Sequence, residues 1–302
     1  MANDILKKTL RHYIDLDMYS NTVIDDMAEM FDDLEDDCDS ILLAQDYYNT
    51  KSEYNMAYQL IKEKVSEFQS KLNKRLDKES ETVLEKELEF LAEAYGASLV
   101  IKKIPASRLL FVPIVDSKDT VKGFSEKIGK NILHSYDNSM RSGYIFGQKS
   151  SDIKESVKRN LAQVKNGMNS GINTAIPSFA KTTDKIIFLN NKEEVVWCSI
   201  LDGRTCIVCG SLNGLRFKSA ADAPACPHFR CRCFLTVASV IREPMMSYEE
   251  YINSLSDEEQ YHILGKNRYE LHKKGLSLEH FVNNGRKLRL DEIDTSDLEM
   301  TE

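Results

Sequence analysis

The chain has 302 residues and a formal net charge of −8, with 42% hydrophobic and 29% charged residues, which is ordinary for a globular protein. No apolar run approaches the roughly 18 residues that a membrane helix needs, and the first residues lack the apolar core of a signal peptide. We therefore expect a protein without a membrane span that stays in the cytoplasm where it is made, and its length predicts two or three units.

Charge is distributed unevenly along the chain. Residues 1–104 carry a net charge of −10 and residues 291–302 carry −6, so residues 105–290 carry +8. A basic middle is compatible with a surface that faces DNA. It is equally compatible with a diffuse excess of lysine and arginine that only keeps the surface solvated.

Residues 1–104 have a helical composition, because they contain no proline and a single glycine, Gly96. Apolar residues recur every three or four positions over residues 3–37, which predicts a first helix. Its opposite face is acidic, with Asp25, Asp26, Glu29, Asp32, Asp33, Asp36 and Asp37. Such a face either meets a basic ring on a partner or is an ordinary solvated helix surface.

A second helix is predicted over residues 47–95, with a possible break at residues 77–80 and a stop at Gly96. A helix of nearly this whole length is too long for a compact domain. We therefore expect either a long antiparallel hairpin or an extended arm that lies on another subunit.

The middle of the chain alternates between predicted extended segments and predicted helices. Residues 97–116 contain short branched apolar runs that end at Pro105 and Pro113, which predicts strands or extended linkers. Helices are then expected over residues 121–143 and 151–164, the second capped by Ser150 or Ser151. Strands are predicted within 192–201 and 232–240. The Asn213-Gly214 pair indicates a tight turn, and we expect a small hairpin over residues 211–217.

These two predicted strands bracket a segment rich in cysteine, which runs from Trp197, the only tryptophan, to Cys233. Two thiols spaced C-x-x-C can face one ion, and a second turn with a cysteine or histidine pair completes the tetrahedron of a structural zinc site. The segment offers six candidate ligands. The first choice is the set whose C-x-x-C and H-x-x-C spacings match, Cys206, Cys209, His228 and Cys231, with Cys226 and Cys233 as alternates.

Other uses of these residues stay open. Buried reduced cysteines are common in protein cores, disulfide or redox use is possible, and a Cys–His nucleophile is conceivable. A zinc deaminase is disfavoured, because its signature needs a glutamate where this chain has Arg230. Arg232 cannot bind zinc but is suited to a charge-assisted bond with Asp202. Trp197 is most simply a core residue, with stacking on DNA as the less favoured alternative.

The same segment resembles the phage head morphogenesis family, the minor head proteins similar to protein F of phage Mu. The matching residues are Trp197, Asp202, Arg204-Thr205-Cys206, Cys209, Leu212, Gly214, Phe217, Pro227-His228 and Cys231-Arg232-Cys233. Residues 248–278 carry a second similarity, Y-E-E-Y followed by Q-x-x-I-L-G-K-x-R-x-x-L and L-S-L. The resemblance covers residues 120–292. It departs from the family pattern at residues 175–186, where Lys181 stands in a helix that usually carries an arginine.

The resemblance implies a structural protein of a tailed phage that has no catalytic activity. Such proteins lie inside the head near the portal vertex, associate with the portal protein, the major capsid protein and packaged double-stranded DNA, and serve head assembly and DNA packaging and delivery. It implies a virion location after assembly in the host cytoplasm, and self-association in few copies per head. Asp202, Arg204 and Arg232 would hold the turns of the core together. The competing hypotheses are a DNA-binding factor similar to a zinc ribbon and, ranked last, a Cys–His enzyme.

The last section, after Pro244, reads as short helices. Ser247 with Glu250 and Ser256 with Glu259 have the spacing of capping boxes, and Gly265 and Gly275 read as helix stops. We expect His262, His272 and His280 to lie on the surface and the acidic end, residues 291–302, to be flexible.

The sequence thus predicts an α+β protein in three consecutive sections. Residues 1–104 form a long N-terminal helical arm that is the candidate contact with the portal or capsid. Residues 105–243 form a helical core with a small antiparallel sheet around the Cys/His cluster at 197–233, and residues 244–302 form a helical C-terminal section with an acidic tail.

Overall fold

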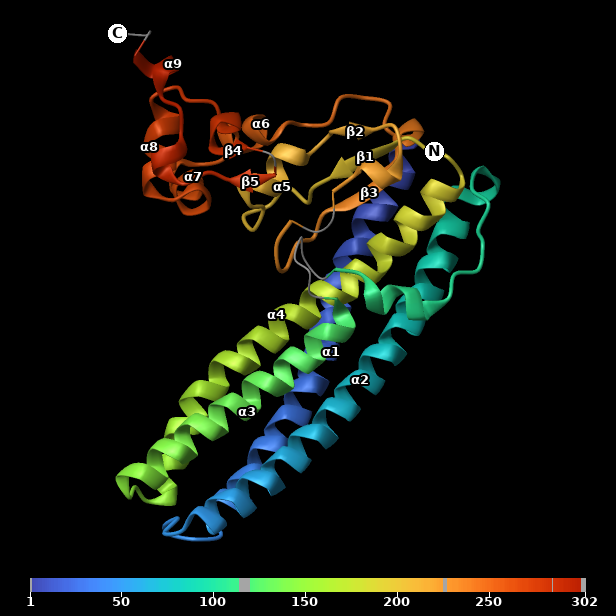
Figure 1. The fold of residues 1–302 in the computed structure, drawn as a ribbon. Helices are drawn as coiled ribbons and strands as arrows, with labels where there is room; N and C mark the ends of the chain where they lie inside the picture. Colours follow the sequence, from blue (N-terminus) through green and yellow to red (C-terminus); the bar gives the residue numbers. More distant parts are fainter. Residues whose placement is uncertain (1, 114–119, 225–226, 284, 300–302) are drawn as a thin grey trace. The chain divides into compact units, whose positions relative to one another are not determined.

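A computed structural model describes residues 2–113, 120–224, 227–283 and 285–299 (Figure 1). Four long helices come first: α1 (Ala2–Leu42), α2 (Lys51–Tyr95), α3 (Val121–Phe146) and α4 (Ser150–Asn190). A small sheet and short helices follow, so the protein is mostly helical and belongs to the α+β class, as predicted. None of the helices in the described part of the chain combines the length and apolar character needed to cross a membrane.

The chain divides into two compact units, and each is assembled from segments that are separate in the sequence. The first unit, here called the sheet unit, contains residues 1–15, 86–103 and 180–302, and the second, the helical unit, contains residues 16–85 and 104–179. Helices α1, α2 and α4 contribute residues to both units, whereas the sections predicted from the sequence are consecutive.

The helical unit is held by contacts among α1, α2, α3 and α4, which run side by side within it (Figure 1). Phe31 of α1 meets Phe68 of α2 edge to face, with 5.8 Å between ring centroids. Tyr54 of α2 donates a 2.5 Å hydrogen bond to Asp137 of α3. Most of the first 95 residues therefore pack inside a bundle with α3 and α4 and do not extend alone.

Three residues of the acidic face of α1 form ion pairs within the helical unit. Arg75 lies 2.7 Å from Asp26, and Lys64 lies 3.0 Å from Asp37. Lys165 pairs with Asp32. Exposed ion pairs of this kind are each worth only about 0–1 kcal/mol, so they orient the helices more than they stabilise them.

Helix α2 is continuous for 45 residues, so the predicted break at residues 77–80 is wrong. Two of the polar residues at the predicted break have hydrogen-bond partners, one in another helix and one within α2. Glu79 is buried and accepts a 2.5 Å hydrogen bond from Tyr19, and the Ser80 hydroxyl donates to the carbonyl of Asp77. The helix predicted over 151–164 is likewise the first part of α4, which continues through Pro177.

Of the two alternatives predicted for residues 97–116, strands or extended linkers, the described residues 97–113 confirm the linker, and residues 114–116 lie outside the described part of the chain. Residues Gly96–Ser98 and Ala106–Phe111 form short 3-10 turns, and the remaining described residues are extended linker. Branched residues form a strand only where another strand offers its hydrogen bonds, and in the described part of this region the only pairing is an isolated bridge between Pro113 and Thr120.

The sheet unit contains a three-stranded antiparallel sheet in the order β2-β1-β3, formed by β1 (Val195–Cys198), β2 (Arg216–Phe217) and β3 (Phe234–Val237). Trp197 pairs with Leu235 across β1 and β3. Every residue of β1 and β3 is buried, which explains why all of them but Thr236 are apolar. The two predicted strands are therefore confirmed and are direct neighbours.

The hairpin predicted over residues 211–217 is wrong. Ser211 and Leu212 close the short helix α5 (Ile207–Leu212). The Asn213-Gly214 turn then leads into β2, whose partner is β1. Gly214 has a φ of +81° and donates its backbone N–H to the carbonyl of Trp197 at 2.9 Å, so the turn ties the end of α5 back to the sheet.

The C-terminal section forms α6 (Tyr248–Asn253), α7 (Asp257–Leu264), α8 (Lys266–Lys273), α9 (Ser296–Glu299) and a small ribbon of β4 (Val282–Asn283) and β5 (Arg286–Lys287). Both predicted capping boxes are present, at Ser247 and Ser256. The apolar faces of these elements share a buried cluster with Ile207 and Val208 of α5. The section therefore packs on the helix that carries the cysteine turn.

One expectation for this section needs correction. His272 is buried, not exposed, and its ring bonds to the carbonyl of Leu276 at 3.0 Å and to the side chain of Asn253 at 2.9 Å. His262 is exposed and His280 half-buried. The described part of the acidic end forms a 3-10 turn at Leu290–Glu292 and helix α9, and its flexibility stays a prediction.

Candidate metal centre

The first half of the cysteine cluster lies at the start of α5. Cys206 precedes the helix, and its Sγ accepts the backbone N–H of Cys209 at 3.4 Å. This local bond turns the chain so that the two thiols of the C-x-x-C spacing face the same side. Cys209 is buried, and Cys206 is half-buried.

The second half lies on the loop that precedes β3, which carries His228, Cys231 and Cys233. Arg230 adopts a φ of +60°, and this turn reverses the loop between the histidine and the cysteines. His228 Nδ1 lies 2.7 Å from the carbonyl of Phe229. Because a carbonyl can only accept, Nδ1 carries a hydrogen, and the neutral ring then presents the lone pair of Nε2 to the thiols.

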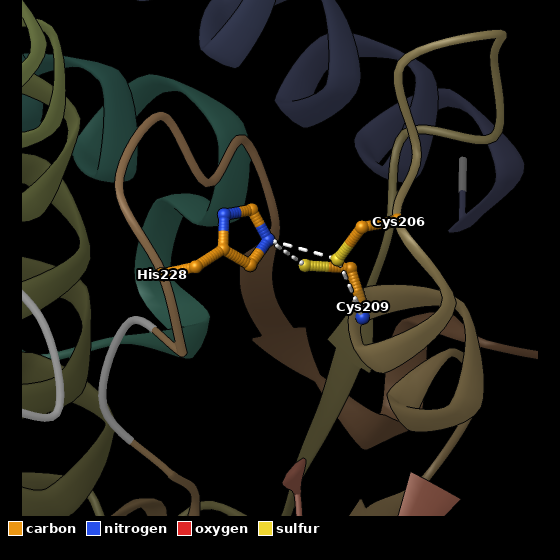
Figure 2. A group of neighbouring side chains, drawn as sticks. All are labelled: Cys206, Cys209 and His228. Carbon is orange, nitrogen blue, oxygen red and sulfur yellow. Dashed lines mark hydrogen bonds between the residues drawn. The ribbon is translucent and has the colours of Figure 1, made fainter. Parts of the chain in front are cut away.

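The two halves converge, although 22 residues separate Cys206 from His228 (Figure 2). His228 Nε2 lies 3.0 Å from Cys206 Sγ and 2.9 Å from Cys209 Sγ. Cys209 Sγ lies 3.7 Å from Cys231 Sγ.

One of these three distances matches a tetrahedral zinc site. Bond lengths of about 2.3 Å to sulfur and 2.0 Å to nitrogen give edges of about 3.8 Å between two sulfurs and 3.5 Å between sulfur and nitrogen. The Cys209–Cys231 separation matches the first edge. The two contacts of His228 are shorter than the second edge, so the ring would retreat by roughly 0.6 Å to accept an ion.

Five potential ligands form two groups that share Cys209. One group is Cys206, Cys209 and His228, and the other is Cys209, Cys231 and Cys233; within each, the ligand atoms lie within 4.8 Å of one another. The structure thus brings all four first-choice residues to one place, with Cys233 beside them. Cys226 lies outside the described residues.

One thiol of the cluster, that of Cys206, is held as a thiolate. A hydrogen bond from Cys209 lowers the pKa of Cys206 to about 4, against the opposing effect of burial, and His228 adds to the lowering. The same network raises the pKa of Cys209, which keeps its proton. The hydrogen bond with Cys206 raises the pKa of His228 to about 9. Cys206 and His228 therefore form a thiolate–imidazolium pair, in which Cys206 has the form of cysteine that binds metals. Cys209 and His228 would each release a proton when an ion binds.

A lysine of α4 also reaches the cluster. Lys181 Nζ lies 3.1 Å from the carbonyl of Cys231 and 3.6 Å from its Sγ. Its positive charge offsets part of the negative charge that several thiolates would bring together. Sequence reasoning noted Lys181 only as a departure from the family pattern. The available signal was that the family pattern also has a cation in this helix.

Ser199 is a second residue that sequence reasoning missed. Its hydroxyl donates a 2.6 Å hydrogen bond to the carbonyl of Cys209 and lies 3.3 Å from Cys233 Sγ. A single serine beside a strand carries no motif, so no sequence signal distinguishes it.

The predicted pair of Asp202 and Arg232 is present and bidentate. Arg232 Nη1 and Nη2 donate to the two carboxylate oxygens at 2.8 and 2.5 Å. The backbone N–H of Arg204 donates to the same carboxylate at 2.9 Å, whereas its side chain is 68% exposed. Partial burial acts against the charged form of Asp202, but these bonds outweigh it and lower its pKa. The fork joins the turn before α5 to the loop before β3.

Trp197 is only 2% exposed and lies in the middle strand of the sheet. A ring so buried is a core residue and cannot stack on a base at the surface.

A comparison of the chain with protein-family models, with curated proteins and with solved structures found no match in any of the three.

Proposed function

We propose that the Cys/His cluster binds one zinc ion in a structural role. The observation that carries this proposal is the convergence of Cys206, Cys209 and His228 from two turns distant in the sequence. The ligand types, the orientation of the His228 ring and the adjacent Lys181 support it. With Cys231 as the fourth ligand, every position of the tetrahedron is filled by protein, as structural zinc sites require, and none remains for a substrate.

We further propose that the chain is a minor head protein of a tailed phage, associated with the portal protein, the major capsid protein and packaged DNA, and that it is not an enzyme. The support is the ordered set of residues that resembles the head morphogenesis family. Several of these residues, Asp202, Arg232 and the cysteines among them, make the contacts that hold the cluster together. Chance similarity is a poorer explanation when the matching residues contact one another in a single local structure.

The test of this role is the composition of purified heads. Mass spectrometry of virions and of empty heads from the phage that encodes the chain should find it in a few copies per portal ring, and full-length protein should co-purify with the portal. Its absence from heads would contradict the proposal. A zinc-ribbon-like DNA-binding factor would instead bind DNA alone, with an affinity that falls steeply with salt.

The full chain is needed in these experiments. Removing residues 1–95 deletes segments of both compact units, and a fragment of residues 105–290 lacks parts of each. Substitutions at exposed residues of α1 and α2, such as Met18 and Met56, test a portal contact without this damage.

A further inference from the structure

Three helices of the sheet unit bring two carboxylic acids together in its interior. Glu87 of α2 and Asp184 of α4 are 0% and 1% exposed. They lie beside His12 and Tyr13 of α1, and none of these four residues belongs to the candidate metal centre. A buried carboxylate is costly unless each oxygen finds a donor, so the donors can be counted.

Two of the four carboxylate oxygens have a donor. Tyr13 donates its hydroxyl to Asp184 Oδ2 at 2.7 Å. His12 Nε2 lies 2.7 Å from Glu87 Oε2. The other two oxygens, Glu87 Oε1 and Asp184 Oδ1, are buried and have no hydrogen-bond donor among the described residues.

We propose that Glu87 and Asp184 share a single proton at neutral pH, and that its loss at alkaline pH loosens the packing of α1, α2 and α4 in the sheet unit. A proton between the two carboxyls lets one oxygen donate to the other and leaves one negative charge on the pair. Without it, two buried negative charges would face each other with no cation bonded to the two free oxygens.

The electrostatics of the site agree. Burial raises the pKa of Glu87 to about 8, and burial followed by the charge of Glu87 raises the pKa of Asp184. Burial also lowers the pKa of His12, so the ring is neutral and Nε2 serves as a donor to Glu87.

The charged and titratable neighbours do not replace this proton. On α1, Asp15 adds further negative charge near His12. On α2, Tyr95 bonds to Thr236 of β3. On α4, the lysines on either side of Asp184 are bonded elsewhere, Lys181 to Cys231 and Lys185 to the carbonyl of Ala223. Lys8, Arg11 and Glu93 line the surface hollow beside His12.

The pair also touches the sheet. Tyr13, which bonds to Asp184, stacks on Phe234 of β3 with 5.0 Å between ring centroids. Loss of the proton would therefore loosen the packing of β3 as well as that of the helices.

The sign of the pH dependence follows from the raised pKa values. A carboxyl whose folded pKa lies above its usual value contributes stability that is complete at acid pH and is lost as pH rises towards the folded pKa, here about 8 for Glu87. For His12 the sign is reversed. Because its folded pKa is lowered, its contribution to stability increases as pH rises to its usual pKa of 6.5. The informative window is therefore from about pH 6.5 to 9.

Infrared spectroscopy of the full-length wild-type protein tests the proposal without any substitution. At pH 7 we expect the C=O band of one protonated carboxyl in a buried environment, which disappears as pH rises through about 8. The double variant Glu87→Gln/Asp184→Asn should abolish the band, because each single variant leaves one buried carboxyl whose burial keeps its pKa raised. Glu89→Gln, which changes an exposed acid on the same helix, should retain it. Absence of the band in the wild type at pH 7 would overturn the proposal.

Hydrogen exchange supplies the structural readout. After correction for the intrinsic effect of pH, exchange in residues 5–15 and 86–95 should accelerate in the wild type between pH 6.5 and 9 and stay constant in the double variant. Equal acceleration in both proteins would contradict the role of the pair.

Discussion

Cys209 is the thiol that both groups of potential ligands share. Its Sγ lies near the His228 ring on one side and near Cys231 on the other. Any zinc ion in the cluster, whichever cysteine completes the tetrahedron, is therefore expected to contact Cys209.

Replacing Cys209 by serine should lower zinc affinity by more than the roughly 10–100-fold that the loss of an outer-shell partner costs. Purified Cys209→Ser protein should contain little zinc and unfold more readily. Cys198→Ser is the control, because Cys198 is also a buried thiol but belongs to neither group. Equal zinc contents in the two variants would contradict the assignment.

Arg232 and Arg204 approach the same carboxylate with different geometry. Arg232 is 10% exposed and forms a fork with Asp202, whereas Arg204 is 68% exposed and its side chain lies 3.8 Å away. Lysine keeps the charge but cannot form the fork. Because Asp202 is itself 37% exposed, solvent screening reduces the expected cost of Arg232→Lys to about 1 kcal/mol of unfolding free energy.

Denaturant unfolding measures this difference. Arg204→Lys should change stability by less than about 0.5 kcal/mol. If Arg232→Lys changes the unfolding free energy as little as Arg204→Lys does, the fork does not stabilise the contact between the two turns.

At the scale of elements, the contact of α5 with α6 depends on a glycine. A Cβ added at Gly210 would lie 2.2 Å from Cγ of Tyr248. The Tyr248 ring is buried against α5, and its hydroxyl donates to the carbonyl of Thr205 at 2.9 Å. The ring and the bond together align the C-terminal section with the cysteine turn.

Gly210→Ala should therefore destabilise the protein by about 1–3 kcal/mol, because the ring is held by its bond and cannot move freely. Gly203→Ala is the matched control, since a Cβ there meets nothing within 4 Å and the backbone needs no positive φ. Thermal unfolding of both variants measures the two changes in stability. Similar losses in the two would show that the α5–α6 contact is not tightly packed.

The features of these elements that could be predicted from the sequence are local ones. Helix periodicity, the capping boxes at Ser247 and Ser256, and the C-x-x-C turn all depend on residues within a few positions of one another, and the structure contains them. The predictions that failed needed distant partners. The Glu79 region continues as helix because Tyr19 of α1 binds it, and the described residues 97–113 have no partner strand.

The candidate site also combines features that the sequence predicts with features that it does not. The types of ligand, their spacing in the sequence and the pair of Asp202 and Arg232 were predictable. Lys181 was not, because it reaches Cys231 from 50 residues earlier in the chain. Spacing also could not rank Cys231 against Cys233, because both lie within reach of Cys209.

At the scale of the whole molecule, the two compact units are interleaved in sequence, but the cluster belongs to the sheet unit alone. Chelation of zinc should therefore accelerate hydrogen exchange in residues 195–237, while residues 16–85 and 121–179 keep their protection. A structural zinc ion contributes on the order of 10 kcal/mol in small sites, so the local effect should be large. Uniform loss of protection would mean that the units do not respond separately.

We expect the four residues Cys206, Cys209, His228 and Cys231 to hold one zinc ion. The most direct measurement is elemental analysis of the purified full chain combined with X-ray absorption at the zinc edge. We predict one zinc per chain, bound by three sulfurs at about 2.3 Å and one nitrogen at about 2.0 Å. Folded protein without stoichiometric zinc, or zinc bound mainly by oxygen, would contradict the account.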